Sequence, residues 1–289
     1  MIGIALALLS AASSGLSVIL VSKYSKKSSA FNISLVISCV GMAVLWPIAI
    51  LLTDFRTVNV DGVLIFAICG VLSPGIVRLL YYKGLKSLGT AVNSSIVSVY
   101  PLYTSLLAVL LLSEILTVEN WLGIVCVVFG IILVENSSKQ TKNGEKLSKI
   151  RLIVPILGGL SLGVASIIRK YGLNIFDAPV LGVAIGYTFS LLPYAMILMF
   201  SAPTRRALSP KRDTRFFWKA GVGQAVSWIT AFYALSYEKV SIVTPLISIE
   251  PVFVILFAYL YLRGVEHISS KLVASIVLTV IGVVLVTIY

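Results

Sequence analysis

Long stretches without a charged side chain are the feature that most constrains this chain. Four of them cover Met1–Ser22, Ser28–Thr53, Gly89–Ser113 and Ala178–Thr204, and a fifth, Lys271–Tyr289, carries only the charge of Lys271. About 20 apolar residues in a helix cross a hydrocarbon core of about 30 Å. Each stretch is therefore predicted to span a membrane, which excludes a water-soluble enzyme, a nucleic-acid-binding module and a disordered chain.

Composition supports this interpretation, because 58% of the residues are hydrophobic and only 12% are charged, against about 25% charged in average soluble domains. Backbone groups inside a bilayer find no water and must bond within the segment, so the spans are expected to be helices. We predict an all-α integral membrane protein with ten transmembrane helices. They cover approximately residues 2–22, 31–53, 62–83, 89–112, 117–135, 152–170, 179–201, 216–237, 240–262 and 269–288.

The two halves of the chain resemble each other weakly. Ser98–Pro101 matches Ser248–Pro251, and Gly130–Val134 matches Gly282–Val286, in the same order in both halves. Five is an odd number of crossings, so a second unit of five enters the membrane from the opposite side, as in the inverted repeats of secondary transporters. We predict two inverted five-helix repeats, residues 1–138 and 152–289, joined by a cytoplasmic linker, residues 139–151.

The basic residues are sorted by loop. With Arg78 and Arg169 counted in the connections nearest to them, 19 of the 23 Lys and Arg residues follow odd-numbered spans. Loops rich in Lys and Arg face the cytoplasm. The sequence therefore predicts a multi-pass protein of the cytoplasmic membrane, with the odd-numbered loops in the cytoplasm and both termini outside. The net charge of +12 is interpreted as topology; binding of an acidic soluble partner is the alternative.

Glu250 is an acidic residue in the middle of a predicted span, 240–262, directly before Pro251. A charge at the bilayer centre costs about 2.5–3.5 kcal/mol, so such residues normally face the bundle interior and serve a substrate or proton path. Two functional roles fit: a carboxylate that binds a cation, and a protonatable group that couples transport to protons. The alternative is a structural carboxylate paired with a neighbouring Tyr or Arg.

Aromatic residues accompany this carboxylate. Tyr100 precedes Pro101 as Glu250 precedes Pro251, and Tyr103 follows one turn later. Ring faces attract cations, so an ammonium group would suit this environment, although packing explains these tyrosines equally well.

Arg78, at the cytoplasmic end of the third span, follows Ser73–Val77, a stretch that predicts an irregular helix. It can clamp a carboxylate or phosphate, neutralise Glu250, or extend its side chain to the head groups. Tyr82 follows within the next turn. In the eighth span, Gln224 and Trp228 lie one turn apart, and Trp228 can stack on a solute or pack against lipid. The predicted site residues are Glu250, Tyr100, Arg78, Trp228, Tyr82, Tyr103, Gln224 and Ser98.

Further motifs lie around the fourth and fifth spans. Pro101 in the fourth span is followed by Ser113–Thr117 with the sequence Ser-Glu-Ile-Leu-Thr, then by Trp121–Gly123 and the Gly-rich stretch Gly130–Val134. This pattern resembles the EamA-type members of the drug/metabolite transporter superfamily, in which the fourth span ends in a Gly-Glu-x-Leu-Thr-like turn; here Ser113 replaces the glycine. The resemblance covers nearly the whole chain. It implies a carrier of small metabolites with a central cavity lined largely by the third, fourth, eighth and ninth spans.

The expected function is secondary active transport of a small polar metabolite, an amino acid or another amine-bearing solute, by alternating access around a central cavity. A carrier of quaternary amines such as choline, with an aromatic cage, and a non-transporting scaffold or lipid-handling protein are the alternatives. The sequence contains no Walker A or HExxH motif, so neither ATP-driven pumping nor an enzyme is predicted. The three cysteines and the single histidine lack metal-ligand spacing, and we predict no metal and no cofactor. The expected partners are the solute, the lipid bilayer and, as a candidate coupling ion, protons, with no nucleic acid; a monomer and a homodimer are both compatible.

Overall fold

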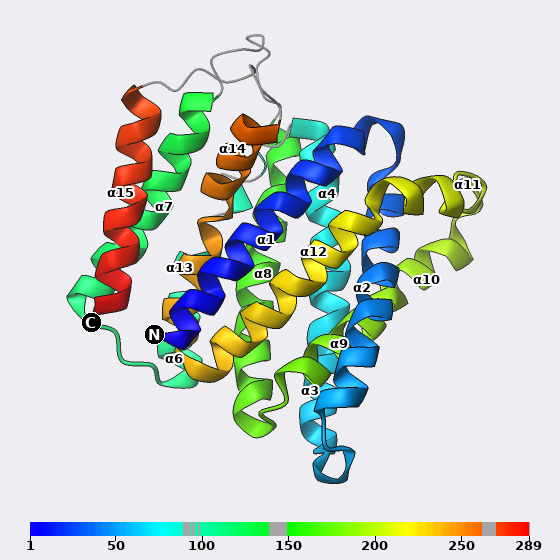
Figure 1. The fold of residues 1–289 in the computed structure, drawn as a ribbon, viewed down its shortest axis with the longest axis horizontal. Helices are drawn as coiled ribbons and strands as arrows, with labels where there is room; N and C mark the ends of the chain where they lie inside the picture. Colours follow the sequence, from blue (N-terminus) through cyan, green and yellow to red (C-terminus); the bar gives the residue numbers. More distant parts are fainter. Residues whose placement is uncertain (89–92, 94–95, 98, 139–148, 262–269, 289) are drawn as a thin grey trace.

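The computed structural model describes residues 1–88, 93, 96–97, 99–138, 149–261 and 270–288. The regular structure of these residues is helical (Figure 1). The first half contains α1 (Ile2–Tyr24), η1 (Ser25–Lys27), α2 (Ala30–Leu52), η2 (Phe55–Thr57), α3 (Val60–Gly70), η3 (Val71–Ile76), α4 (Val77–Leu88), α6 (Tyr100–Leu112) and α7 (Val118–Ser138). The second half contains α8 (Lys149–Ile175), α9 (Pro179–Phe189), α10 (Leu191–Phe200), α11 (Ala202–Arg206), α12 (Pro210–Tyr237), α13 (Val240–Ser248), α14 (Glu250–Tyr261) and α15 (Ser270–Ile288).

The helices lie where the charge-free stretches predict them. Six helical segments of the described chain are long and apolar enough to cross a membrane. The helices α6, α7 and α15 contain shorter apolar segments. The long helix α12 falls outside both groups, because polar residues such as Gln224 and Ser227 interrupt its apolar sequence. The structure therefore confirms an all-α protein with multiple membrane-spanning helices, while the number ten stays a prediction.

Some of the prolines in the spans coincide with breaks in the helices. The third predicted span is interrupted by the π-helical segment η3, inside which Ser73 is extended (φ −145°, ψ 116°) before Pro74. The ninth is interrupted at Ile249, directly before Glu250 and Pro251. A proline supplies no N–H and its ring clashes with the carbonyl four residues earlier. The break in the third span confirms the irregular stretch that the sequence predicts.

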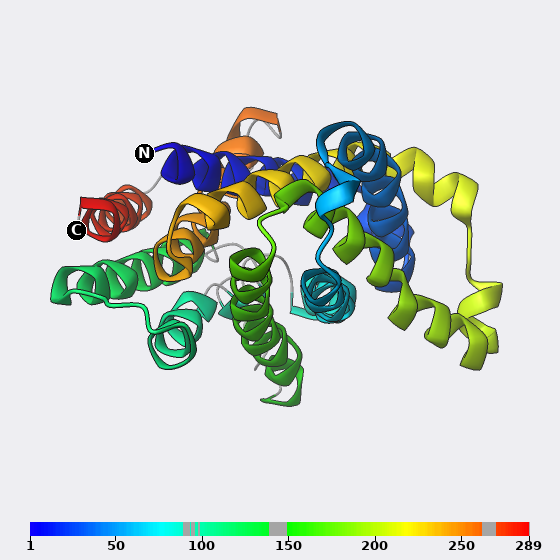
Figure 2. The ribbon, with the colours of Figure 1, turned by 90° about the horizontal axis from the view of Figure 1, so that it is seen from below.

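The helices of the two halves are intercalated. The helix α1 packs against α12 and α14, and α2 packs against α12; in the same way, α8 packs against α4 and α6, and α9 packs against α3. Numbered by predicted span, the pairs 1–8, 1–9 and 2–8 recur as 6–3, 6–4 and 7–3. Seen end on, α1 and α12 (blue and yellow) lie on one side, and α8 and α3 (green and cyan) on the other (Figure 2). This recurrence supports the predicted repeats, whose boundaries and inversion stay a prediction.

The helices α7 and α15 form a closely packed pair at one side of the molecule (Figure 1). Two glycines make their approach close: a Cβ added to Gly123 would lie 2.8 Å from the carbonyl oxygen of Gly282, and a Cβ added to Gly282 would lie 2.6 Å from the backbone nitrogen of Val127. Lipid tails supply no hydrophobic drive between helices, so small residues at such crossings stabilise the pair through van der Waals contact.

Both chain termini lie at the same end of the bundle (Figure 1). Lys23, in the last turn of α1, and Lys26 and Lys27, which follow α1, lie at the opposite end. An even number of crossings requires this arrangement, and it agrees with the loop parity on which the predicted orientation rests. The side of the membrane that each end faces stays a prediction.

Candidate functional site

A cavity of about 160 Å³ lies between the two halves. The breaks in the third and ninth spans contribute Ser73 and Glu250 to its wall, and α6 and α12 contribute Tyr100 and Trp228. The helices α1 and α8 also line the cavity, with Ser14 and Arg169 among their residues. The wall therefore includes the four spans that the family resemblance implies and, in addition, the first and the sixth.

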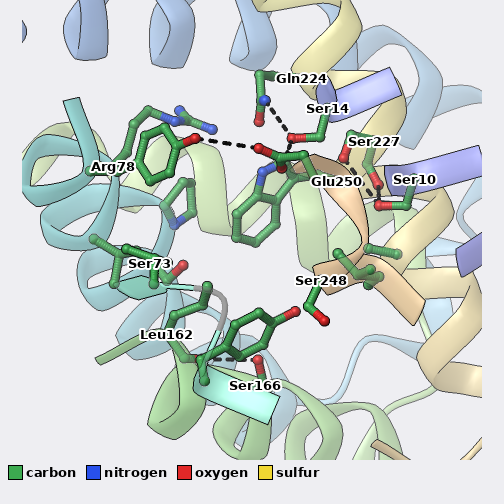
Figure 3. Close-up of a pocket in the computed structure, with 18 of the residues that line it drawn as sticks. Ser10, Ser14, Ser73, Arg78, Leu162, Ser166, Gln224, Ser227, Ser248 and Glu250 are labelled. Atoms are coloured by element: carbon green, nitrogen blue, oxygen red, sulfur yellow. Dashed lines mark hydrogen bonds between the residues drawn. The ribbon is translucent and has the colours of Figure 1, made fainter. Parts of the chain in front are cut away.

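Glu250 is the first residue of α14, and its carboxylate accepts two hydrogen bonds from other helices. Ser14 Oγ donates to Oε2 at 2.5 Å, and the Tyr81 hydroxyl donates to Oε1 at 3.4 Å. The amide nitrogen of Gln224 donates to Ser14 Oγ at 3.0 Å, so the serine proton is directed at the carboxylate. Figure 3 shows this convergence of α1, α12 and α14. The carboxylate is held as an acceptor at the edge of the cavity.

A second polar contact between α1 and α12 lies one turn of α1 earlier. Ser10 Oγ donates to the carbonyl oxygen of Ser227 at 2.8 Å and lies 3.1 Å from Ser227 Oγ (Figure 3). Both serines line the cavity. The polar side chains of α1 thus make one side of the cavity hydrophilic, whereas small residues there suggest only close helix packing when the sequence is considered alone.

Arg78 lines the cavity, but its terminal nitrogens are engaged elsewhere. Nη1 donates to Ser38 Oγ at 2.7 Å, and Nη2 donates to the Tyr187 hydroxyl at 2.8 Å. The guanidinium carbon also lies 4.7 Å from the centroid of the Tyr187 ring. These contacts join α4 to α2 and α9. Within the described residues Arg78 has no ion pair with Glu250, so the structure does not bring them together as a neutralised pair.

Arg169 in α8 is the second arginine of the cavity. Its side chain is 4% exposed, and its guanidinium carbon lies 4.4 Å from the centroid of the Trp228 ring and 5.0 Å from that of Phe232. Two of its nitrogens, Nε and Nη2, have no hydrogen-bond partner among the described residues. A buried guanidinium with unused donors is uncommon, because burial of an unpaired polar group is costly.

Sequence reasoning missed Arg169 because it adjoins Lys170 at the predicted end of the sixth span, where a pair of cations is typical of a loop. The helix α8 instead continues to Ile175. Lys170 bonds to the carbonyl oxygens of Leu235 and Glu238, which leaves Arg169 directed inward. One signal was present: adjacent residues of a helix point about 100° apart, so a helix that continues past Arg169 and Lys170 directs the two side chains to different neighbours.

The predicted site residues divide as follows. Tyr103 is 38% exposed and is not among the residues that line the cavity. Three residues advance a helix by about 300°, so the direction of Tyr103 differs by about 60° from that of Tyr100. Ser98 lies outside the described residues. The predicted residues that line the cavity are Glu250, Tyr100, Arg78, Trp228, Tyr82 and Gln224.

Broken, membrane-spanning helices around a central cavity that contains buried charged side chains are typical of membrane transporters. The EamA-like transporter family matches residues 1–135 and 149–288, which is nearly the whole chain. The protein therefore belongs to the EamA-like transporter family, within the drug/metabolite transporter superfamily, and the family resemblance is confirmed.

Similarity to solved structures supports the fold. A protein described only as "Crystal structure of protein" superposes with a TM-score of 0.78 over 99% of this chain and 96% of its own, at 15% sequence identity. At this identity the match shows a shared fold alone. A comparison with curated proteins finds no match.

Proposed function

We propose that this transporter moves a small amine-bearing solute, in particular an amino acid, across the cytoplasmic membrane by secondary active transport. The observation that carries the proposal is the position of Glu250: a carboxylate at a helix break, in a cavity between the two halves, without an ion pair among the described residues. An ammonium group of the solute supplies the missing positive charge.

The free-energy cost of placing the Glu250 carboxylate inside a membrane span supports a functional role for this residue. A charge at this depth costs about 2.5–3.5 kcal/mol on insertion scales. Two hydrogen bonds, from Ser14 and Tyr81, offset part of this cost and fix the direction of the carboxylate. The structural alternative is pairing with a neighbouring Arg or Tyr. Arg78 bonds to Ser38 and Tyr187 instead, and the Tyr81 hydroxyl contributes one hydrogen bond at 3.4 Å but no positive charge.

The arrangement of helices supports alternating access around a fixed site. The cavity lies where helices of one half pack against helices of the other, and its wall contains the breaks at Ser73 and Ile249. In secondary transporters, substrates bind at such discontinuous helices while the two repeats rock against each other. A proton is the proposed coupling ion, and Glu250 is its proposed acceptor.

A choline-like solute in an aromatic cage receives less support. Trp228 is the strongest cation-binding ring in the cavity, but Arg169 already lies over it at 4.4 Å. A second cation on this ring would be close to the guanidinium and would be repelled.

Reconstitution in proteoliposomes tests the proposal. Flux of radiolabelled amino acids and primary amines is measured for the wild type, Glu250→Gln, Glu250→Asp and the control Asp61→Asn, which removes an exposed carboxylate in the first turn of α3. We expect saturable flux of at least one amine-bearing solute in the wild type and the control. Glu250→Gln should lower it by about 10- to 100-fold, the equivalent of one charge-assisted contact, and Glu250→Asp by less.

Two outcomes would overturn the proposal: wild-type flux in Glu250→Gln, or no flux and no binding for any amine of the panel in the wild type. The same vesicles with an imposed pH gradient test proton coupling separately. Flux of the wild type against the gradient of the solute, driven by the pH gradient, supports a proton as the coupling ion. Flux that does not respond to the pH gradient excludes proton coupling.

A further inference from the structure

We propose that Arg169 is an anion-binding group of this cavity and holds the carboxylate of the transported solute, so that the substrate is a zwitterion whose amine faces Glu250. The inference rests on the proposed function and assigns the anionic end of the substrate to a residue in α8. Arg78, which the sequence suggests for this role, is not the carboxylate ligand.

The unused nitrogens of Arg169 are the ones that a carboxylate needs. Nε and Nη2 lie along one edge of the planar guanidinium, and their N–H groups point in the same direction. A carboxylate accepts from such an edge through two parallel hydrogen bonds. Both atoms are buried and have no partner among the described residues, and Arg169 lines the cavity.

The surroundings of Arg169 fix its plane and leave this buried edge without a hydrogen-bond partner among the described residues. The rings of Trp228 and Phe232 lie near the guanidinium carbon, at 4.4 and 5.0 Å from their centroids. Such contacts stabilise a cation through the ring faces, but they do not accept the in-plane hydrogen bonds. The guanidinium is thus held in place before a ligand arrives, which lowers the entropy lost on binding.

Arg78 differs in this respect. Its Nη1 and Nη2 both donate to protein groups, Ser38 and Tyr187, and in the described part of the chain none of its side-chain nitrogens is both buried and without a partner. Two arginines thus line one cavity, but only one retains a complete edge of donors. The contrast separates a structural arginine from one that is ready to bind a ligand.

The cavity contains one acidic and one basic side chain that a zwitterionic ligand can bridge. Glu250 and Arg169 both line it, and neither belongs to an ion pair within the described residues. The volume of about 160 Å³ resembles that of an engineered cavity of about 150 Å³ that binds benzene. A small zwitterion fits this size and leaves the site electrically neutral, whereas a phosphate would add excess negative charge beside Glu250.

A matched series of probes tests the inference on the purified, full-length protein. Binding is measured by thermal shift and by competition in proteoliposomes for each of the twenty amino acids, its decarboxylated amine and its deaminated acid. In the wild type we expect the preferred amino acid to bind at least about tenfold more tightly than its amine, since a bidentate pair contributes more than one ordinary hydrogen bond.

Variants assign this preference to a residue. Arg169→Lys keeps the charge and loses the edge of parallel donors, and Arg169→Gln loses both. Each should lower amino-acid affinity towards that of the amine, by about 10- to 100-fold for Arg169→Gln, with amine affinity unchanged. Arg205→Gln, which removes an exposed arginine of α11, serves as the control. If Arg169→Gln fails to insert, Arg169→Lys still decides the question.

The outcomes separate this inference from the proposed function. If amines and amino acids bind equally in the wild type, or if Arg169→Lys retains the full preference for the carboxylate, the role of Arg169 is overturned while transport of an amine stands. If only the deaminated acids bind, the role of Glu250 fails and an anion site at Arg169 remains. If no probe of the series binds, both proposals fail.

Discussion

Ser14 Oγ donates a 2.5 Å hydrogen bond to Oε2 of Glu250 and so joins the middle of α1 to the first residue of α14. The two helices also pack closely there, because a Cβ added to the neighbouring Gly15 would lie 3.2 Å from the carbonyl oxygen of Glu250. The helix α1 therefore acts as the support of the proposed amine site. The contact requires a hydroxyl at position 14, because Ser14 Oγ accepts a hydrogen bond from Gln224 and donates one to the carboxylate.

Ser14→Ala should weaken binding of the solute. Loss of the hydroxyl leaves Oε2 of Glu250 without its shorter hydrogen bond and frees the carboxylate to turn, a loss of about 1–2 kcal/mol or roughly 5- to 30-fold in affinity. Saturation curves of solute uptake measure the effect. The control is Ser17→Ala, three residues later, because Ser17 bonds to the carbonyl oxygen of Ser13 and does not line the cavity. Equal uptake curves for Ser14→Ala and the wild type would contradict the support role.

Arg78→Gln should affect stability more than specificity. Its removal leaves the Ser38 and Tyr187 hydroxyls without a buried donor, and loss of one partner from such a network costs about 2–4 kcal/mol. We expect a clearly lower thermal midpoint in detergent, with an unchanged ratio of amino-acid to amine affinity in the protein that folds. A lost carboxylate preference at an unchanged midpoint would transfer the anion-binding role from Arg169 to Arg78.

Much of the architecture could be predicted from the sequence because the cost of burying a charge in a bilayer acts on each segment separately. A charge-free stretch of sufficient length is a span whichever neighbours it acquires. The positions at which a helix breaks are harder to predict. Pro74 and Pro251 lie at breaks, whereas α2 continues through Pro47, because a surrounding bundle can compensate for one missing hydrogen bond.

The site could be predicted only in part, because pairing between distant helices has no local signal. Glu250 was evident as an isolated acid in a span. That Arg78 bonds to Tyr187, 109 positions away, follows from the packing of α4 against other helices. The same holds for Arg169, whose burial depends on the ring of Trp228. Tyr100 and Tyr103 lie three residues apart but differ in exposure, 6% against 38%, because exposure depends on the helices that pack against each position.

Gly70→Ala should impair folding, and Gly186→Ala at the same helix crossing should not. The helices α3 and α9 touch here, but the contact is asymmetric: a Cβ added to Gly70 would lie 2.3 Å from the carbonyl oxygen of Gly186, whereas one added to Gly186 would lie 3.8 Å from Cα of Gly70. The first position requires the helices to separate, and the second is ordinary contact. Yield of monodisperse protein and the thermal midpoint compare the two. Equal tolerance of both alanines would show that this crossing is looser than the structure indicates.

The predicted orientation can be measured at two positions on opposite ends of the bundle. Lys26 follows α1 in η1, and Asp54 follows α2, so one helix length separates them. Because loops rich in Lys and Arg face the cytoplasm, we expect Asp54→Cys to react with a membrane-impermeant maleimide in intact cells. Lys26→Cys should react only after the membrane is permeabilised. Both substitutions are made in a background without Cys39, Cys69 and Cys126, which are free thiols.

The structure places Arg78 and Arg169 inside helices. The asymmetry of the loops remains when these two residues are left out of the count, because each side then loses one basic residue. The reverse labelling pattern would place both termini in the cytoplasm and would show that the charge of the loops does not set the topology of this chain.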